Sequence, residues 1–206
     1  MLGEAADCAV ANWRRKAVWS VALTVFFCVP YFTLQRVALM PLRTFPPSIV
    51  DTAIAFDARW TGVYQSGYVL LCVVPWLLDR GEDVDRYVRG FVGISLVGFA
   101  CFVLLPVSAP RPAVTPDAGM YALLVSYDGP TNEFPSLHVA LLAFTIRIAA
   151  RTSRGRMTPA RRLSLLSGAT VWTAAVGYAA IATKQHYAID LPAGLLLALA
   201  VDRQLG

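Results

Sequence analysis

Long apolar runs separated by short polar interruptions constrain the fold of this chain more than any other feature. Several runs approach the roughly 20 residues that a helix needs to cross about 30 Å of hydrocarbon. Over 206 residues, 57% of the side chains are hydrophobic and 15% are charged, which is far more apolar than an average soluble domain. The pattern predicts an all-α integral membrane protein in which residues 1–206 form a single polytopic bundle.

We expect six transmembrane helices, covering residues 17–37, 61–78, 90–107, 136–150, 163–183 and 189–201. Between the first two spans, prolines interrupt any continuous helix, and the helical spacing of the apolar residues predicts a short helix lying at the membrane interface within residues 40–60. Residues 79–89 and 108–132 are expected to be loops. The first apolar run has no clear small-residue cleavage site, which favours a retained helix over a signal peptide.

Basic residues gather in alternate loops, and this asymmetry predicts the orientation of the bundle. Six crossings bring both ends of the chain to one side, and the more basic side should be cytoplasmic. Twelve of the eighteen Lys and Arg residues fall there: Arg14, Arg15, Lys16, Arg80, Arg86, Arg89, Arg151, Arg154, Arg156, Arg161, Arg162 and Arg203. The chain is thus expected in the plasma or inner membrane with both termini cytoplasmic. The loop before the fourth span and the turn before the sixth then share the outer or periplasmic face.

The net charge of +5 does not predict a nucleic-acid partner, because the basic residues lie at the ends of apolar runs and form no patch with interleaved aromatic residues. The four cysteines have neither disulfide nor zinc-site spacing, and we interpret them as small apolar side chains. No metal or other cofactor is predicted. The oligomeric state is not indicated by the sequence.

The chain contains two histidines, each in a polar interruption beside a long apolar run. His186 and Asp190 are four residues apart, so at the start of a helix they share one face. An isolated Asp in an apolar span is costly, whereas a carboxylate beside an imidazole fixes the tautomer and leaves the other nitrogen free to attack. This spacing predicts a nucleophilic His186 oriented by Asp190. The alternative is that both residues cap the last helix or pair within the bundle.

The second histidine, His138, falls in the first turn of the fourth expected span, after Pro135 and Ser136. Pro is tolerated and Ser can cap at such a position, and the exposed N–H groups of a helix start favour phosphate. A protonated His138 can serve as a general acid for the departing oxygen; the alternative is an interfacial surface histidine. Arg111 and Lys184 are cations expected on the same face that can hold phosphate oxygens, or they are snorkelling interfacial side chains.

Taken together, these stretches resemble a known family. PSLH at residues 135–138 and HYAID at 186–190 look like the second and third signatures of the type 2 phosphatidic acid phosphatase superfamily of membrane lipid phosphatases. Arg111-Pro112 resembles the end of its first signature, so the signature region covers about residues 104–194. The runs at 134–140, 184–187 and 64–68 are most similar to the inositol phosphorylceramide synthase, or inositolphosphotransferase, branch.

This resemblance implies a lipid phosphatase or phosphotransferase that works through a phosphohistidine at the outer face. His186 would attack phosphorus, Asp190 would orient it, and His138 would protonate the leaving group, while Arg111 and Ser136 would hold phosphate oxygens. The implied substrate is a phospholipid, sphingolipid or polyprenyl phosphate. The acceptor is water or an alcohol, and no metal is implied.

Two departures from the family pattern concern phosphate-binding cations. Leu104 stands where the first signature of the phosphatases has Lys, and Ala179-Ala180 stand where the third signature usually has Ser-Arg. Lys184 is expected to replace one of the missing cations. These departures leave an alternative from another class, a non-catalytic bundle that binds or moves lipid and carries degenerate motifs.

Overall fold

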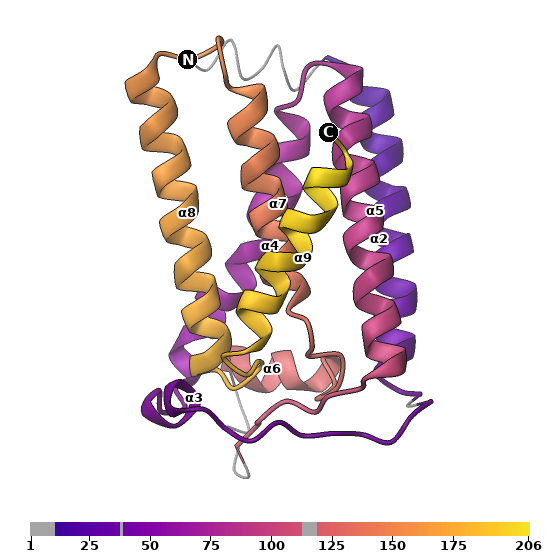
Figure 1. Ribbon diagram of the computed structural model, residues 1–206, viewed down its shortest axis with the longest axis vertical. Helices are drawn as coiled ribbons and strands as arrows, with labels where there is room; N and C mark the ends of the chain where they lie inside the picture. Colours follow the sequence, from indigo (N-terminus) through magenta and orange to yellow (C-terminus); the bar gives the residue numbers. More distant parts are fainter. Residues whose placement is uncertain (1–10, 38, 113–118) are drawn as a thin grey trace.

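The computed structural model describes residues 11–37, 39–112 and 119–206, and its regular structure there is helical (Figure 1). The long helices pack side by side as a bundle: α2 (Trp13–Leu34), α4 (Thr61–Trp76), α5 (Gly81–Leu104), α7 (Leu137–Thr152), α8 (Pro159–Ala182) and α9 (Asp190–Gln204). The short helices α3 (Ile49–Ala53) and α6 (Gly119–Tyr127) lie at one end, with the 3₁₀ turn η1 (Ala58–Trp60) leading into α4. The all-α fold class is therefore confirmed for the described part of the chain.

Among the described residues, three helices, α2, α5 and α8, are long and apolar enough to cross a membrane by length and composition. This supports association with a membrane. Helices α4 and α7 have 16 residues each and α9 has 15, fewer than the roughly 20 that a perpendicular crossing needs. Six crossings therefore stay a prediction.

The expected loop at residues 79–89 is wrong, because α5 begins at Gly81. Glu82 and Asp83 occupy the first turn, where negative charge interacts favourably with the helix N-terminus. Asp85 forms an ion pair with Arg15 of α2. The polar start of α5 is thus an extension of the apolar helix, stabilised both by these charges and by the burial of Val84, Tyr87 and Val88.

The expected loop at residues 108–132 is also partly wrong, because it contains α6, which buries Tyr121 and Leu124. The interfacial helix predicted within residues 40–60 is much shorter than its apolar spacing suggests. It is limited to the five residues of α3 and begins with a reciprocal cap in which Ser48 and Asp51 each accept a main-chain N–H of the other. The remainder of that segment is extended or turns into η1.

The start of α2 and the end of α9 lie at the same end of the bundle, together with the α4–α5 and α7–α8 connections (Figure 1). Asn12 Nδ2 donates to the Asp79 carbonyl at 2.7 Å, and Arg86 Nη1 donates to the Gly206 carbonyl at 2.8 Å. Arg156 reaches from the α7–α8 connection to the same Asp79. The opposite end carries α3, α6 and the starts of α7 and α9. Which membrane face each end meets stays a prediction.

Helix α7 forms the centre of the core and packs against α4, α5, α8 and α9. Leu142, Phe144 and Ile148 on this helix are fully buried. Gly90 of α5 makes room for Phe144, since a Cβ atom at Gly90 would lie 1.9 Å from the ring. This packing fixes the axis of α7 and therefore the position of its first turn, where the site begins.

Candidate active site

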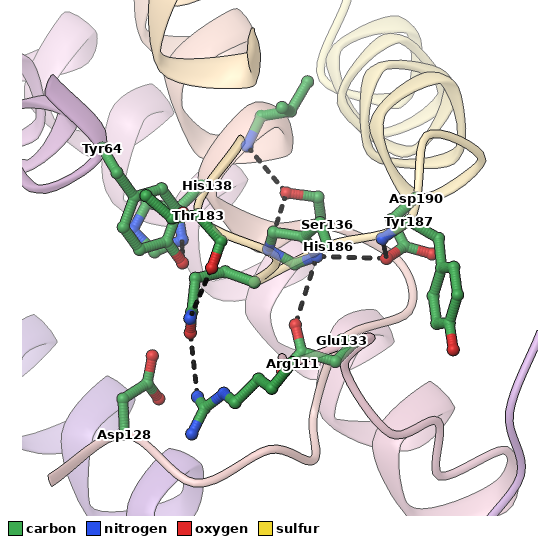
Figure 2. Close-up of polar contacts among 12 residues, drawn as sticks. Tyr64, Arg111, Asp128, Glu133, Ser136, His138, Thr183, His186, Tyr187 and Asp190 are labelled. Carbon is green, nitrogen blue, oxygen red and sulfur yellow. Dashed lines mark hydrogen bonds and ion pairs between the residues drawn. The ribbon is translucent and has the colours of Figure 1, made fainter. Parts of the chain in front are cut away.

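His186 lies in the turn between α8 and α9, where the Ala180 carbonyl accepts the main-chain N–H of His186 at 3.2 Å. Its Nδ1 atom lies 3.2 Å from Asp190 Oδ2. The same carboxylate oxygen accepts the Tyr187 main-chain N–H at 2.8 Å, so Asp190 is held before it orients the ring (Figure 2). His186 Nε2 points the other way, to Ser136 Oγ at 3.2 Å. One ring nitrogen of His186 is thus within hydrogen-bond distance of a carboxylate, and the other faces the start of α7.

Ser136 is the N-cap of α7 and accepts the Val139 main-chain N–H, which confirms the predicted cap. Its own main-chain N–H donates to the Asp190 carbonyl at 3.1 Å. The two helix starts can approach this closely because residue 194 is glycine, where a Cβ atom would lie 2.3 Å from the Ser136 carbonyl oxygen. The structure therefore brings together the two predicted halves of the site.

His138 occupies the first turn of α7 between two tyrosine rings of α4. The ring centroids of Tyr64 and Tyr68 lie 4.5 and 4.9 Å from that of His138. Tyr64 Oη lies 3.2 Å from His138 Nδ1, and the two histidine rings are 6.4 Å apart between centroids. His138 Nε2 is buried without a hydrogen-bond partner in the described part of the chain. If the Tyr64 hydroxyl donates to Nδ1, the proton of the neutral ring sits on Nε2.

The predicted phosphate ligand Arg111 lies beside the turn that carries His186. Its Nη2 atom donates to Gln185 Oε1 at 2.8 Å and to the Gly129 carbonyl at 2.9 Å. Its Nε atom is buried and has no hydrogen-bond partner among the described residues. A buried guanidinium N–H and the buried His138 Nε2 are both groups that an anion could satisfy.

Lys184 is placed differently from the other predicted phosphate ligands. It adopts a left-handed backbone conformation with φ of 54°. Its ammonium donates to the main-chain carbonyls of Asp51, at 2.8 Å, and Ile54. Asp51 in turn accepts the Ala188 main-chain N–H at 2.7 Å, so the α3 region holds the histidine-bearing turn on both sides of His186. The phosphate-binding role of Lys184 stays a prediction.

Two acidic residues near His186 were not predicted as part of the site (Figure 2). Glu133 Oε2 lies 3.3 Å from His186 Nδ1, so a second carboxyl group faces the nitrogen that Asp190 contacts. Burial raises the pKa of Glu133 well above its ordinary range, and the charge of Asp128 raises it further. Burial also raises the pKa of Asp128, which accepts from the Tyr31 hydroxyl and from Gln35. The raised pKa favours the neutral carboxyl form of Glu133.

These residues had weak signals in the sequence. Glu133 lies directly before the PSLH stretch, in the same polar interruption, but no helical period connects it with His186. Tyr64 and Tyr68 are one helical turn apart in a segment noted for its family resemblance. Gln185 lies next to His186. A search for polar residues adjoining the two motifs would have found Glu133 and Gln185.

An apolar cavity of about 430 Å³ opens beside the two histidines. Its walls come mainly from α2, α4 and α5, and its far end lies near the start of α2. Residues at its two ends include Tyr68, His138 and His186 on one side and Lys16, Trp19 and Trp76 on the other. The Lys16 ammonium donates to the Trp76 carbonyl at 2.9 Å. The cavity can therefore accept an apolar chain whose polar end lies at the histidines.

Comparison with known protein families gives a match to a model described as the PAP2 superfamily, over residues 48–202. This range contains every predicted site residue from Arg111 to Asp190 and begins after α2. Comparisons with curated proteins and with solved structures gave no match.

Proposed function

The chain belongs to the PAP2 superfamily, and on that premise we propose that it is a membrane enzyme that cleaves a lipid phosphoester through a covalent phosphohistidine at His186. One observation carries the proposal. His186 Nδ1 is hydrogen-bonded to a buried carboxylate while Nε2 lies 3.2 Å from Ser136 Oγ at a helix start. An oriented imidazole beside an anion-binding helix terminus is suited to attack on phosphorus.

In the first step, the lone pair of His186 Nε2 forms a bond to phosphorus, and the bond between phosphorus and the departing alcohol oxygen breaks. His138 gives a proton to that oxygen. Asp190 accepts the Nδ1–H throughout and stabilises the positive charge that the phosphorylated ring acquires. Arg111 and the Ser136 hydroxyl bind the non-bridging oxygens, where positive charge and N–H donors stabilise the transition state.

In the second step, an acceptor oxygen attacks phosphorus, its proton passes to His138, and the bond between phosphorus and Nε2 breaks. Water as acceptor makes the enzyme a phosphatase. An alcohol, such as inositol or a lipid hydroxyl, makes it a phosphotransferase like the inositol phosphorylceramide synthases that the motifs resemble. Lys184 is included as a further phosphate cation in this proposal, and the site is proposed to face the outer side.

A lipid substrate is supported by the apolar cavity, because its polar end lies at His138 and His186 and the remainder is lined mainly by α2, α4 and α5. Phospholipids, sphingolipids and polyprenyl phosphates all combine an apolar chain with a phosphate. We propose one of these classes as substrate.

The decisive experiment traps the intermediate. Purified protein is mixed with a phospholipid labelled in its phosphate, quenched at alkaline pH because phosphohistidine is acid-labile, and digested for mass spectrometry. Label is expected on His186 and should be absent from the His186→Ala protein. Label on another residue, or none while product forms, would contradict the proposal. Repeating the reaction with inositol and with a lipid alcohol distinguishes transfer from hydrolysis.

A second candidate function rests on the missing cations. Ala179 and Ala180 are buried at the end of α8, where the family signature usually has Ser-Arg. A site with fewer phosphate cations suits a bundle that binds or moves lipid without cleaving it. Full biological activity of the His186→Ala protein would favour this second function.

A further inference from the structure

At the end of the bundle opposite the histidines, a hollow of about 610 Å³ lies between the start of α5 and the end of α7. We call it the basic hollow, because five arginines line it: Arg80, Arg86, Arg151, Arg154 and Arg156. Asp83 is the one acidic side chain among the described residues of its lining. The walls come from the start of α5, the end of α7, the α7–α8 connection and Gly206, so residues far apart in the sequence contribute to a single concave surface.

Three of the arginines have partners at the wall of the hollow. Arg86 Nη1 donates to the Gly206 carbonyl at 2.8 Å, and Arg156 pairs with Asp79 and lies 3.9 Å from Asp83. Arg151 Nη2 donates to Asp202 at 3.1 Å, a carboxylate that Arg147 also contacts.

The positive charge of the basic hollow exceeds what these partners balance. Arg151 Nη1 is buried and has no hydrogen-bond partner in the part of the chain that the structure describes. The side chains of Arg80 and Arg154 are exposed, and neither guanidinium group makes a hydrogen bond or ion pair to any residue within 11–37, 39–112 or 119–206. Like charges held together repel, so an anion that enters the hollow gains favourable interactions with several guanidinium groups.

The arginine side chains of the basic hollow are suited to binding a phosphate group. A guanidinium presents a planar fork of N–H donors that matches two phosphate oxygens, and Arg80 lies at the N-cap of α5, where main-chain N–H groups also favour anions. The described lining contains no aromatic side chain on which a base could stack. Helix α5 is a candidate membrane span that begins at this hollow, which puts the arginines at the level of lipid head groups.

We propose that the basic hollow is a second phosphate-binding site, separate from the histidines, which takes the phosphodiester head group of an anionic phospholipid in the adjacent leaflet. The site does not depend on the proposed catalytic function. Its ligand is bound and not cleaved, since the lining described above has no histidine or other nucleophile placed as His186 is.

The test measures binding of short-chain phosphatidylglycerol to the full-length protein by native mass spectrometry and by titration in neutral detergent. All variants carry His186→Ala, so that no lipid is turned over. Arg80→Gln with Arg154→Gln removes two positive charges whose guanidinium groups make no hydrogen bond or ion pair within the described residues, and should weaken binding about tenfold or more. The matched control, Arg36→Gln with Arg43→Gln, removes two exposed arginines at the histidine end and should leave binding unchanged.

Further arms identify the source of the phosphate. Phosphatidylcholine, which is zwitterionic, should bind about tenfold more weakly than phosphatidylglycerol, and glycerol phosphate or inorganic phosphate alone should bind weakly. Unchanged phosphatidylglycerol binding by the Arg80/Arg154 variant would overturn the proposal, as would an equal loss in the control. Free phosphate binding as tightly as the lipid, and lost in the same variant, would overturn the lipid assignment. Equal melting temperatures of the variants exclude misfolding as the cause.

Discussion

The two histidines lie 6.4 Å apart between ring centroids, yet their surroundings differ in kind. His186 has carboxyl groups of Asp190 and Glu133 at one nitrogen. His138 has the hydroxyl of Tyr64 at one nitrogen and no carboxylate within ion-pairing distance among the described residues. A carboxylate makes an imidazole more basic and stabilises its cation, which suits a nucleophile. A ring between tyrosines is better suited to pass a proton and return to neutrality.

Replacing each histidine by alanine tests this division most strongly. His186→Ala should lower kcat by about 10⁴-fold or more, because no other group supplies the attacking atom. His138→Ala should cost about 10² to 10⁴-fold with a natural lipid. With a nitrophenolate leaving group, which needs no proton, activity should return in His138→Ala and stay absent in His186→Ala. Recovery in both variants would show that the roles are wrongly assigned.

Asp190→Asn should have the next largest effect, about 10² to 10⁴-fold on kcat, because an amide stabilises neither the tautomer nor the cation of His186. The comparison is Asp128→Asn. Asp128 is also a buried acid near the site, but it contacts Tyr31 and Gln35 rather than a histidine. If Asp128→Asn lowers kcat as much as Asp190→Asn does, the contact between Asp190 and His186 is not the cause of the loss.

Lys184→Ala should lower turnover about tenfold and also lower the melting temperature, since two carbonyls of the α3 region lose a charged donor. Separate measurement of kcat and KM identifies the cause. If Lys184→Ala raises KM and Lys184→Arg restores it, Lys184 contacts phosphate. If Lys184→Ala instead lowers both kcat and the melting temperature, Lys184 acts by stabilising the turn that carries His186. Near-normal turnover of Lys184→Ala would contradict both roles.

The buried carboxyl group of Glu133 predicts a pH dependence of both stability and activity. Burial raises the pKa of Glu133 well above its ordinary 4.5, so the carboxyl is neutral below the raised pKa and ionised above it. Its contribution to the free energy of unfolding is full below about 4.5 and is lost as pH rises through the raised value. The same ionisation places a negative charge beside the bound phosphate, so kcat/KM should fall over that range.

Glu133→Gln stays neutral and should remove that fall, raising kcat/KM a few-fold at the alkaline end of the profile. Asp57→Asn is the control, because Asp57 is paired with the exposed Arg59 away from the histidines. Its profile should match that of the unmodified protein. A Glu133→Gln profile that superimposes on the unmodified one would contradict the prediction.

The smallest expected effect is that of Tyr64→Phe, which removes the hydroxyl at His138 Nδ1 and leaves the ring. One hydrogen bond contributes about 0.5 to 1.5 kcal/mol, so kcat should fall about 2- to 10-fold. Tyr68→Phe keeps the ring contact with His138 and should change kcat less than Tyr64→Phe does. Equal effects would show that the tyrosines act through packing alone.

Local pattern predicted the parts of the site that depend on neighbours in sequence. The four-residue spacing of His186 and Asp190, and the cap at Ser136, follow from helix geometry and are present in the structure. Glu133 and Tyr64 reach their histidines across 53 and 74 residues, so only tertiary packing connects them. The charge of Lys184 was visible in the sequence, but the Asp51 and Ile54 carbonyls that bind it were not.

The fold, like the site, was predictable where it depends on local sequence and not where it depends on tertiary contacts. Apolar runs located the six long helices, because burial and membrane insertion both depend on local hydrophobicity. The polar extension of α5 and the short helix α6 were missed, because ion pairs and packing against distant helices stabilise them. Arg15 with Asp85 and the buried Tyr121 are the respective examples.

Helices α7 and α9 are joined at both ends by hydrogen bonds or ion pairs. Near the site, the main chain of Ser136 is bonded to that of Asp190, and at the far end Asp202 of α9 receives Arg147 and Arg151 of α7. Contacts at both ends of a helix pair oppose hinge and sliding motions between the two helices. We therefore expect the two halves of the site, one on each helix, to move together. Helix α2, by contrast, buries little beyond Lys16 and Leu23 and forms one wall of the apolar cavity. We therefore expect any movement that opens the apolar cavity to occur in α2 rather than between α7 and α9.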